Sequence, residues 1–272
     1  MSHQAIGCRA TGKIACAILL LCAFLSGCAS SYATPGHGAQ MQVFAAAKDQ
    51  LSDASVVRAI ARQPLASLPA SIAFVRVQSP GYSSETAQGW GGGAYSVVTQ
   101  RDIQNEDQTL AEMRSKMPKV KGFAPISRLL LPEEMHSDLE LRQAAAALHA
   151  DMVLIYTLDT SFNVQDVAAP LSVVTLGLSP NQIAHVNCTA AAVLIDTRNG
   201  YVYGIAEATE QQDQLAIAWT STAAVDQTRK RVEGKAFAKL AGELEQTWSG
   251  VVANLNGSQE ASPAGVRYPS AP

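Results

Sequence analysis

Apolar positions follow two different periods along this chain, and the change of period predicts where strands and helices lie. Runs rich in β-branched and aromatic residues lie at 71–78, 123–131 and 151–161, and they predict strands. Between them, at 99–117 and 133–150, apolar residues recur at intervals of three, four or seven, which predicts helices. The strand at 151–161 is the most apolar and is typical of a central strand covered on both faces.

The second half of the chain predicts a long hairpin and a long helix. Two alternating arms, 185–196 and 201–211, flank Asn199-Gly200, a pair that favours tight hairpin turns because both residues accept a positive φ. Apolar residues then recur at helical spacing over 222–254. A further short strand or apolar loop is expected at 170–178.

This order of elements predicts the fold class. Strand, helix, strand, helix, strand, hairpin, helix indicates an α/β fold with a mixed β-sheet covered by helices. We expect this domain to span residues 71–255, preceded at 28–70 by a tether with a possible helix over 41–62. Residues 256–272 are rich in Gly, Ser and Pro, and they predict a disordered tail.

The N-terminal residues have the pattern of a secretory leader. Arg9 and Lys13 precede an apolar run from Ile14 to Leu25, which is too short for a membrane span of about 20 residues. The run ends in Leu25-Ser26-Gly27-Cys28, which resembles the lipobox of bacterial lipoproteins.

The lipobox resemblance implies that residues 1–27 are a cleaved signal peptide and that Cys28 becomes the acylated N-terminus. Several acyl chains hold a protein firmly at a membrane, because each buried methylene contributes about 0.8 kcal/mol. Ala29 follows, where Asp would signal retention in the inner membrane. We therefore expect a protein in the inner leaflet of the outer membrane that faces the periplasm, with the inner membrane as the alternative.

Charge and cysteine content limit which kinds of partner and which covalent cross-links are expected. The chain has 20 basic and 23 acidic residues, and it has no basic tract, which argues against nucleic acid as a partner. With Cys28 acylated and the leader removed, Cys188 is the remaining thiol, so no intramolecular disulfide forms. Cys188 lies in an apolar run, which indicates a buried, inert thiol rather than a reactive one.

Motifs for catalysis, metals or cofactors are not recognisable. The sequence has no Gly-x-Ser-x-Gly, no His-Glu-x-x-His and no zinc spacing of Cys and His, so we predict no catalytic residue, no metal and no cofactor. The glycine-rich run 89–93 lacks the spacing of a phosphate-binding loop. We interpret it as a mobile surface loop whose exposed Trp90 is a candidate contact for a partner protein.

Two stretches carry a family resemblance. Residues 141–156 look like the helix and Ala-Asp-led strand of periplasmic lipoproteins related to the curli secretion lipoprotein, and residues 193–203 are similar to the hairpin that follows in them. The match is closer to the rhombotarget lipoproteins and covers roughly 71–252. The chain lacks that family's glycine-rich sorting tail and membrane helix, and it lacks the long amphipathic strands of the curli pore.

Two classes of function follow. The first is an envelope protein, not an enzyme, that acts by protein–protein interaction as an accessory or assembly factor, through a partner or through ring-like self-assembly. The second is an envelope hydrolase whose residues are brought together only by the fold.

Overall fold

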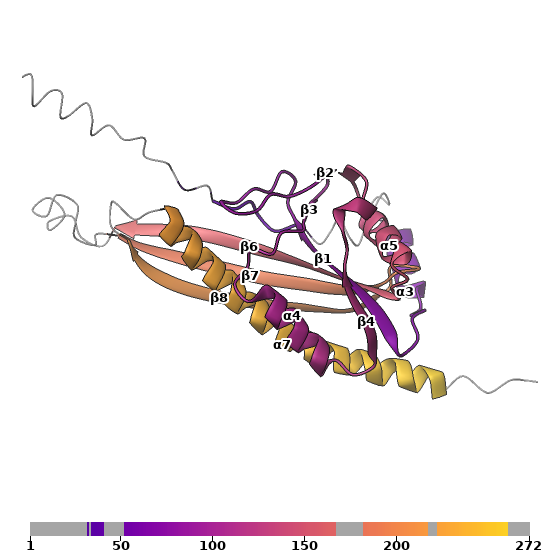
Figure 1. The fold of residues 1–272 in the computed structure, drawn as a ribbon. Coiled ribbons are helices and arrows are strands. Elements are labelled where there is room, and N and C mark those ends of the chain that lie inside the picture. Colours follow the sequence, from indigo (N-terminus) through magenta and orange to yellow (C-terminus); the bar gives the residue numbers. More distant parts are fainter. Residues whose placement is uncertain (1–31, 33, 41–51, 167–181, 217–221, 261–272) are drawn as a thin grey trace, which may run out of the picture. The chain divides into compact units, whose positions relative to one another are not determined.

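The computed structural model describes residues 32, 34–40, 52–166, 182–216 and 222–260. It divides the chain into a unit of residues 1–32 and a unit of residues 33–272, and the description below concerns the second. The predicted fold class is confirmed: the second unit is a mixed α/β structure (Figure 1).

A six-stranded mixed sheet runs through this unit in the order β3-β1-β6-β7-β8, with β4 also paired to β1. Pairing of β1 is parallel with β6 and β4 but antiparallel with β3, and β6, β7 and β8 form an antiparallel meander. The strands are β1 (Ala70–Gln78), β3 (Ser96–Val98), β4 (Val120–Pro125), β6 (Met152–Asp166), β7 (Gln182–Asp196) and β8 (Val202–Ala216).

The edge of the sheet next to β1 is split. β4 pairs with β1 up to Phe74, and β3 pairs with it from Arg76 onward. Val75 is paired on its other side with Ile155 of β6, so between the two edge strands there is a notch. This notch positions the cavity described below.

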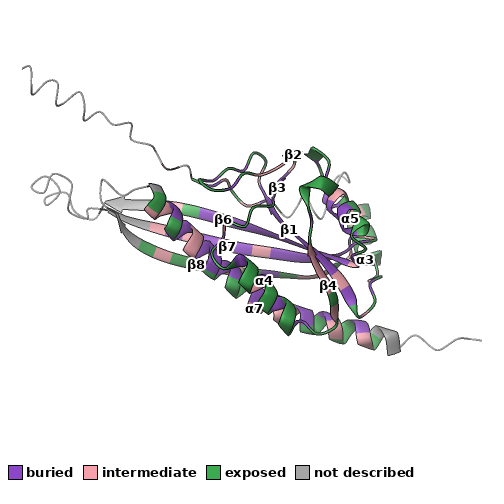
Figure 2. Ribbon diagram, in the orientation of Figure 1, coloured by how far each residue is buried: buried purple, intermediate pink, exposed green. Residues whose placement is uncertain are grey.

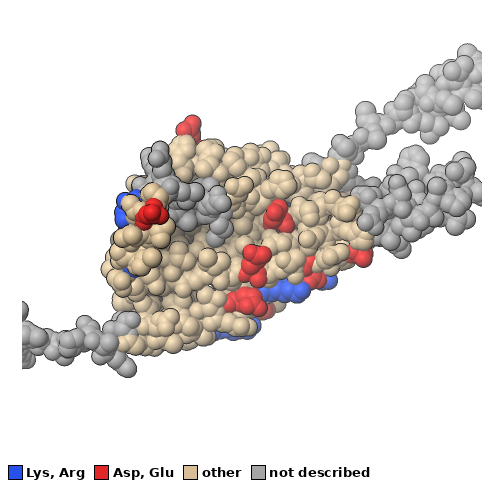
Figure 3. Space-filling model, turned by 180° about the vertical axis from the view of Figure 1, so that it is seen from behind, with Lys and Arg blue, Asp and Glu red and all other residues tan. Residues whose placement is uncertain are grey.

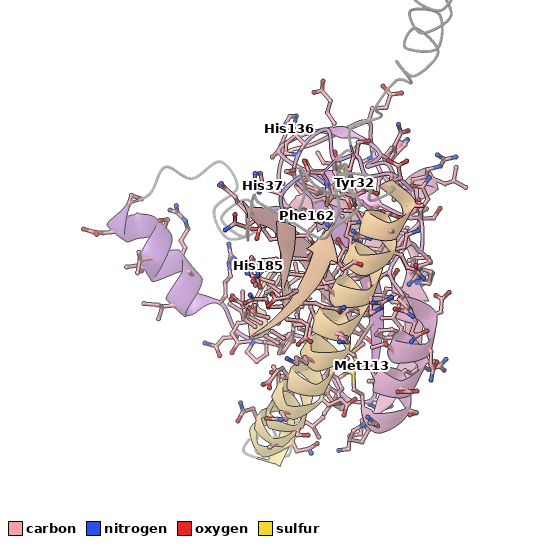
Figure 4. The ribbon with its side chains drawn as sticks, turned by 90° about the vertical axis from the view of Figure 1, so that its left-hand side faces the viewer. Tyr32, His37, Met113, His136, Phe162 and His185 are labelled. Carbon is pink, nitrogen blue, oxygen red and sulfur yellow. The ribbon has the colours of Figure 1, made fainter. Side chains whose placement is uncertain are left out.

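Two apolar clusters lie on opposite faces of the sheet. The larger is formed by even-numbered positions of β6 and β7 with α7 (Thr222–Glu260) and α4 (Glu106–Lys116), and Met113 of α4 lies against α7 (Figure 4). The smaller is formed by odd-numbered positions of β1 and β6 with α5 (Asp138–Ala147). Figure 2 shows the purple, buried stripe of α7 turned toward the strands.

Local sequence explains where these helices begin and end. Ser137 and Glu140 form a capping box at the start of α5, and Ser52 caps α3 (Asp53–Ala61) in the same way. Helix α4 begins only after Asn105, which has a left-handed φ of 61°. The expected start of this helix near residue 99 is therefore wrong, because residues 99–105 form a connection that carries Asp102 into the interior.

The glycine-rich run is ordered by backbone pairing rather than being a loose surface loop. β2 (Gly92–Gly93) pairs with β5 (Glu134–Met135), so residues 133–134 lie outside the helix predicted to include them. A Cβ on Gly93, whose φ is +88°, would lie 2.2 Å from the carbonyl oxygen of Met135. This close approach explains why glycine is needed there.

The hairpin is confirmed, and its end is fixed by Asp196. This fully buried carboxylate accepts hydrogen bonds from the backbone N–H groups of Leu65 and Ala66, both at 2.9 Å, and from the Tyr203 hydroxyl at 2.7 Å. In the turn, Gly200 has a positive φ and Asn199 does not, in contrast to the expectation for both residues.

Other boundaries differ from the sequence prediction. The strand expected at 123–131 ends at Pro125 and is followed by the short 3-10 helix η1 (Arg128–Leu130). Helix α7 extends to Glu260, beyond the predicted start of the tail at 256. The strand or loop expected at 170–178 lies outside the described residues. No helix in the described part of the chain has the length and apolarity needed to cross a membrane.

Candidate functional site

One face of the β6–β8 meander is open over residues 159–163, 185–189 and 209–213, which are exposed or half-buried on this side, whereas nearer α5 the same face belongs to the smaller apolar cluster. α7 covers the other face, where even-numbered residues of β6 and β7 and Ala206 of β8 are buried. On the open face three cross-strand rows of polar side chains lie side by side. The rows are Asp159–Thr189–Thr209, Ser161–Asn187–Gln211 and Asn163–His185–Asp213.

This open face is polar and carries little charge. Its outer residues on β6 and β8, among them Ser161, Thr209 and Gln211, are exposed. Hydrogen bonds join residues within two of the rows: the Thr189 and Thr209 hydroxyls lie 3.0 Å apart, and His185 Nδ1 lies 2.7 Å from Asp213. Figure 3 shows the molecule from behind, where most of the coloured surface is uncharged and acidic side chains lie together with basic ones toward the lower edge.

The outer edge of β8 extends this face. β8 is the last strand of the sheet and is 15 residues long. Edge strands present unpaired backbone N–H and C=O groups that favour pairing with another chain. Ile205, 64% exposed, adds an apolar side chain near the start of this strand.

A network of buried charges lies on the opposite side of the sheet, between β1, α7 and the connection before α4. Arg229 of α7 is fully buried and contacts three carboxylates: Glu233 at 2.7 Å, Asp226 at 2.9 Å and Asp102 at 3.1 Å. Arg76 of β1 donates to Asp102 at 2.6 Å and to the Tyr82 hydroxyl at 3.0 Å. The network joins the helix to the sheet.

The electrostatics of the network follow from this geometry. Burial raises the pKa of Asp102, but the charges of Arg76 and Arg229 outweigh burial and hold that pKa below its ordinary value. For Glu106 burial dominates and its pKa is raised, although the Tyr156 hydroxyl donates to it at 2.5 Å. Glu106 Oε2 and Arg76 Nε are buried without a hydrogen-bond partner in the described structure.

Cys188 is a buried free thiol, which agrees with the predicted inert role. Burial raises its pKa to about 12, so the reactive thiolate is not populated at neutral pH.

A catalytic triad of Ser161, His185 and Asp159 would need His185 to bond both other side chains, and in the described structure it bonds neither of them. His185 pairs with Asp213 instead, and Asp159 lies 3.4 Å from His37 (Figure 4).

A cavity of about 370 Å³ occupies the notch between β3 and β4. Three arginines, Arg76, Arg101 and Arg128, line it, and no histidine, carboxylate or cysteine of the described residues does. Sequence reasoning missed it because β3 is only three residues long. Its other lining residues are Phe74, Val75, Val98, Thr99, Pro125, Ile126, Ser127, Leu129 and Tyr156.

Of the two predicted site residues, Cys28 lies outside the described part of the chain. Trp90 is half-buried: its backbone pairs with Val97, and its side chain packs against the smaller apolar cluster. It is thus not the freely exposed aromatic that was expected, and its contact with a partner stays a prediction. Within the described ranges no group of three metal-ligating side chains occurs.

The fold thus places the chain among mixed α/β domains with one helix-covered and one partly open sheet face. No protein-family model matches the sequence, and no curated protein matches it significantly. Solved structures give weak similarities. A candidate lipoprotein from Caulobacter crescentus CB15 is 15% identical, with 43% of this chain and 81% of that chain covered and a TM-score of 0.23.

Two further structures are similar at the same level. A Xanthomonas campestris protein of the DUF330 family is 14% identical over 73% of this chain and 92% of its own, with a TM-score of 0.32. A variant of PelC from Paraburkholderia phytofirmans, a dodecamer, is 12% identical over 68% and 94%, with a TM-score of 0.25. TM-scores this low do not establish a shared fold, so the resemblance to rhombotarget and curli secretion lipoproteins stays a prediction.

Proposed function

We propose that this chain is a lipid-anchored envelope protein that faces the periplasm and acts by binding another protein. The anchor is acylated Cys28 in the inner leaflet of the outer membrane, as the lipobox pattern of residues 25–28 implies. The single observation that supports the binding role is the open face of β6–β8, which continues to an outer edge of β8 that no strand of the described residues pairs with.

The chemistry of the open face suits docking. Hydroxyl and amide side chains offer donors and acceptors without the desolvation cost of buried charges. An extended partner segment can add main-chain hydrogen bonds along β8 while its side chains contact the polar rows. The cavity described above has no described histidine or carboxylate in its lining that could act as acid or base, so it does not itself support the hydrolase alternative.

The test is site-specific photocrosslinking in intact cell envelopes. A benzophenone amino acid replaces Thr209 on the open face, and a matched control replaces Gln246, an exposed residue of α7. The proposal predicts a discrete adduct from position 209 and none from 246. A heterologous adduct would identify an accessory role, and a ladder of self-adducts an assembly role. No adduct from 209, or equal adducts from both positions, would contradict docking through this face.

A further inference from the structure

The lining of the cavity in the notch of the sheet is basic, although Asp102, which is not a lining residue, pairs with Arg76. Three guanidinium groups lie on its lining, and none of its described lining residues is acidic. Arg128 makes no side-chain ion pair with any described residue. The contacts of Arg101 with Glu106 and Asp107 are long, at 3.5 Å each.

The innermost arginine has an unused donor. The Arg76 side chain is 1% exposed, and its two terminal nitrogens bond Asp102 and Tyr82. Its Nε has no partner in the described structure. A buried N–H without a partner costs free energy, but this Nε is fully buried, so Arg76 acts on the cavity through its positive charge rather than through this donor.

The remaining walls are largely apolar. Leu129, Ile126 and Pro125 lie on the side of β4, and Phe74 and Tyr156 come from the central strands. The Arg101 guanidinium lies 5.1 Å from the centre of the Phe74 ring, which fixes its plane beside the cavity. The volume is at the lower end of the range of small-molecule sites, about 300–1,000 Å³.

We propose that this cavity binds a small organic anion in which a carboxylate or phosphate group is joined to an apolar body. The acidic group pairs with the guanidinium groups of Arg101 and Arg128 and approaches Arg76, because planar guanidinium forks match carboxylate and phosphate oxygens. The apolar body lies against the apolar part of the lining, which includes Leu129 and Pro125. This site is separate from the open face of β6–β8.

The test uses water-soluble probes on the full chain purified in detergent. Ligand-observed NMR titrations compare benzoate and phenyl phosphate with benzamide, a neutral molecule of nearly the same shape as benzoate, and with inorganic phosphate. We expect at least one of the two aromatic anions to bind, benzamide and inorganic phosphate to bind far more weakly, and affinity to fall as NaCl is raised. Preference between benzoate and phenyl phosphate distinguishes a carboxylate from a phosphate ligand.

Variants connect the binding to the cavity. Arg128→Gln and Arg101→Gln each remove one charge from side chains at the rim, and each is expected to weaken binding about tenfold. Arg114→Gln on α4 removes an exposed arginine away from the cavity and is expected to leave binding unchanged. Equal binding of benzamide and benzoate, equal effects of all three variants, or no binding of either aromatic anion would overturn the proposal.

Discussion

The buried network around Arg229 makes a quantitative prediction about stability. In Arg229→Met the guanidinium is lost while the three carboxylates stay. Asp102 keeps Arg76 at 2.6 Å, and Asp226 keeps Lys230 at 3.0 Å. Among the described residues Glu233, 1% exposed, keeps the Thr160 hydroxyl at 2.8 Å but no ion pair, so it becomes the buried carboxylate without a paired cation.

The magnitude follows from that one carboxylate. Removing a partner from a buried ion pair costs about 3–5 kcal/mol. For a chain of this size each kcal/mol lowers Tm by about 2–4 °C, so a decrease of about 6–20 °C is expected. Thermal unfolding of both proteins at neutral pH, followed by circular dichroism, measures it. Arg231→Met, two residues further along α7, is the control, because Arg231 takes part in none of these ion pairs.

A second substitution separates the cost of the unpaired Glu233 charge from the cost of lost packing around Arg229. Adding Glu233→Gln to Arg229→Met removes the uncompensated charge while keeping the shape and the contact with Thr160. The double variant should therefore be more stable than Arg229→Met alone. A loss under about 1 kcal/mol in Arg229→Met, or no recovery in the double variant, would show that the network does not carry this energy.

Four further predictions follow from single features. The stability of the wild-type protein relative to Asp102→Asn should fall as pH drops below about 4. The reason is that the ionised Asp102 carboxylate, whose pKa is lowered in the folded protein, stabilises the fold until it is protonated; equal pH profiles of urea unfolding would refute this. Gly93→Ala should disrupt the β2–β5 pair and lower Tm, whereas Gly250→Ala, whose Cβ meets nothing within 4 Å in α7, should be neutral or stabilise by up to about 1 kcal/mol. A maleimide should label Cys188 only after denaturation, as read by peptide mass; rapid labelling of native protein would show that the thiol is accessible. Cys28→Ala should abolish incorporation of labelled palmitate and release the protein from membranes, and retained lipid would place the anchor elsewhere.

The sequence predicts the fold where a pattern is long and locally encoded. The hairpin follows from two alternating arms around Asn199-Gly200, and α7 follows from an apolar stripe that continues over many turns. The notch could not be predicted, because β3 has three residues and lies next to a glycine-rich run whose pairing with β5 depends on tertiary contacts. Propensity carries little information over such short segments.

A signal for the buried network was present in the same patterns. Arg76 occupies the core-facing position after Ile72 and Phe74 in a strand whose residues 72–77 are otherwise apolar. Arg229 likewise lies near Val232 on the buried side of α7. A charged residue on a core-facing stripe implies a buried partner, because an isolated buried charge is too costly. The carboxylates that pair with such an arginine depend on the tertiary fold, and the spacing of apolar residues along the sequence does not reveal them.

The central claim is that the open face of β6–β8 binds a protein in the envelope. The most direct measurement is co-purification from crosslinked envelopes of the wild-type chain, of a Thr209→Arg/Gln211→Arg double variant and of Gln246→Arg on α7. We expect the two open-face arginines to remove the bound protein while Tm and membrane fractionation stay unchanged, and the α7 variant to retain it. Full retention of the partner by the double variant, or its loss from the Gln246→Arg protein alone, would contradict the claim.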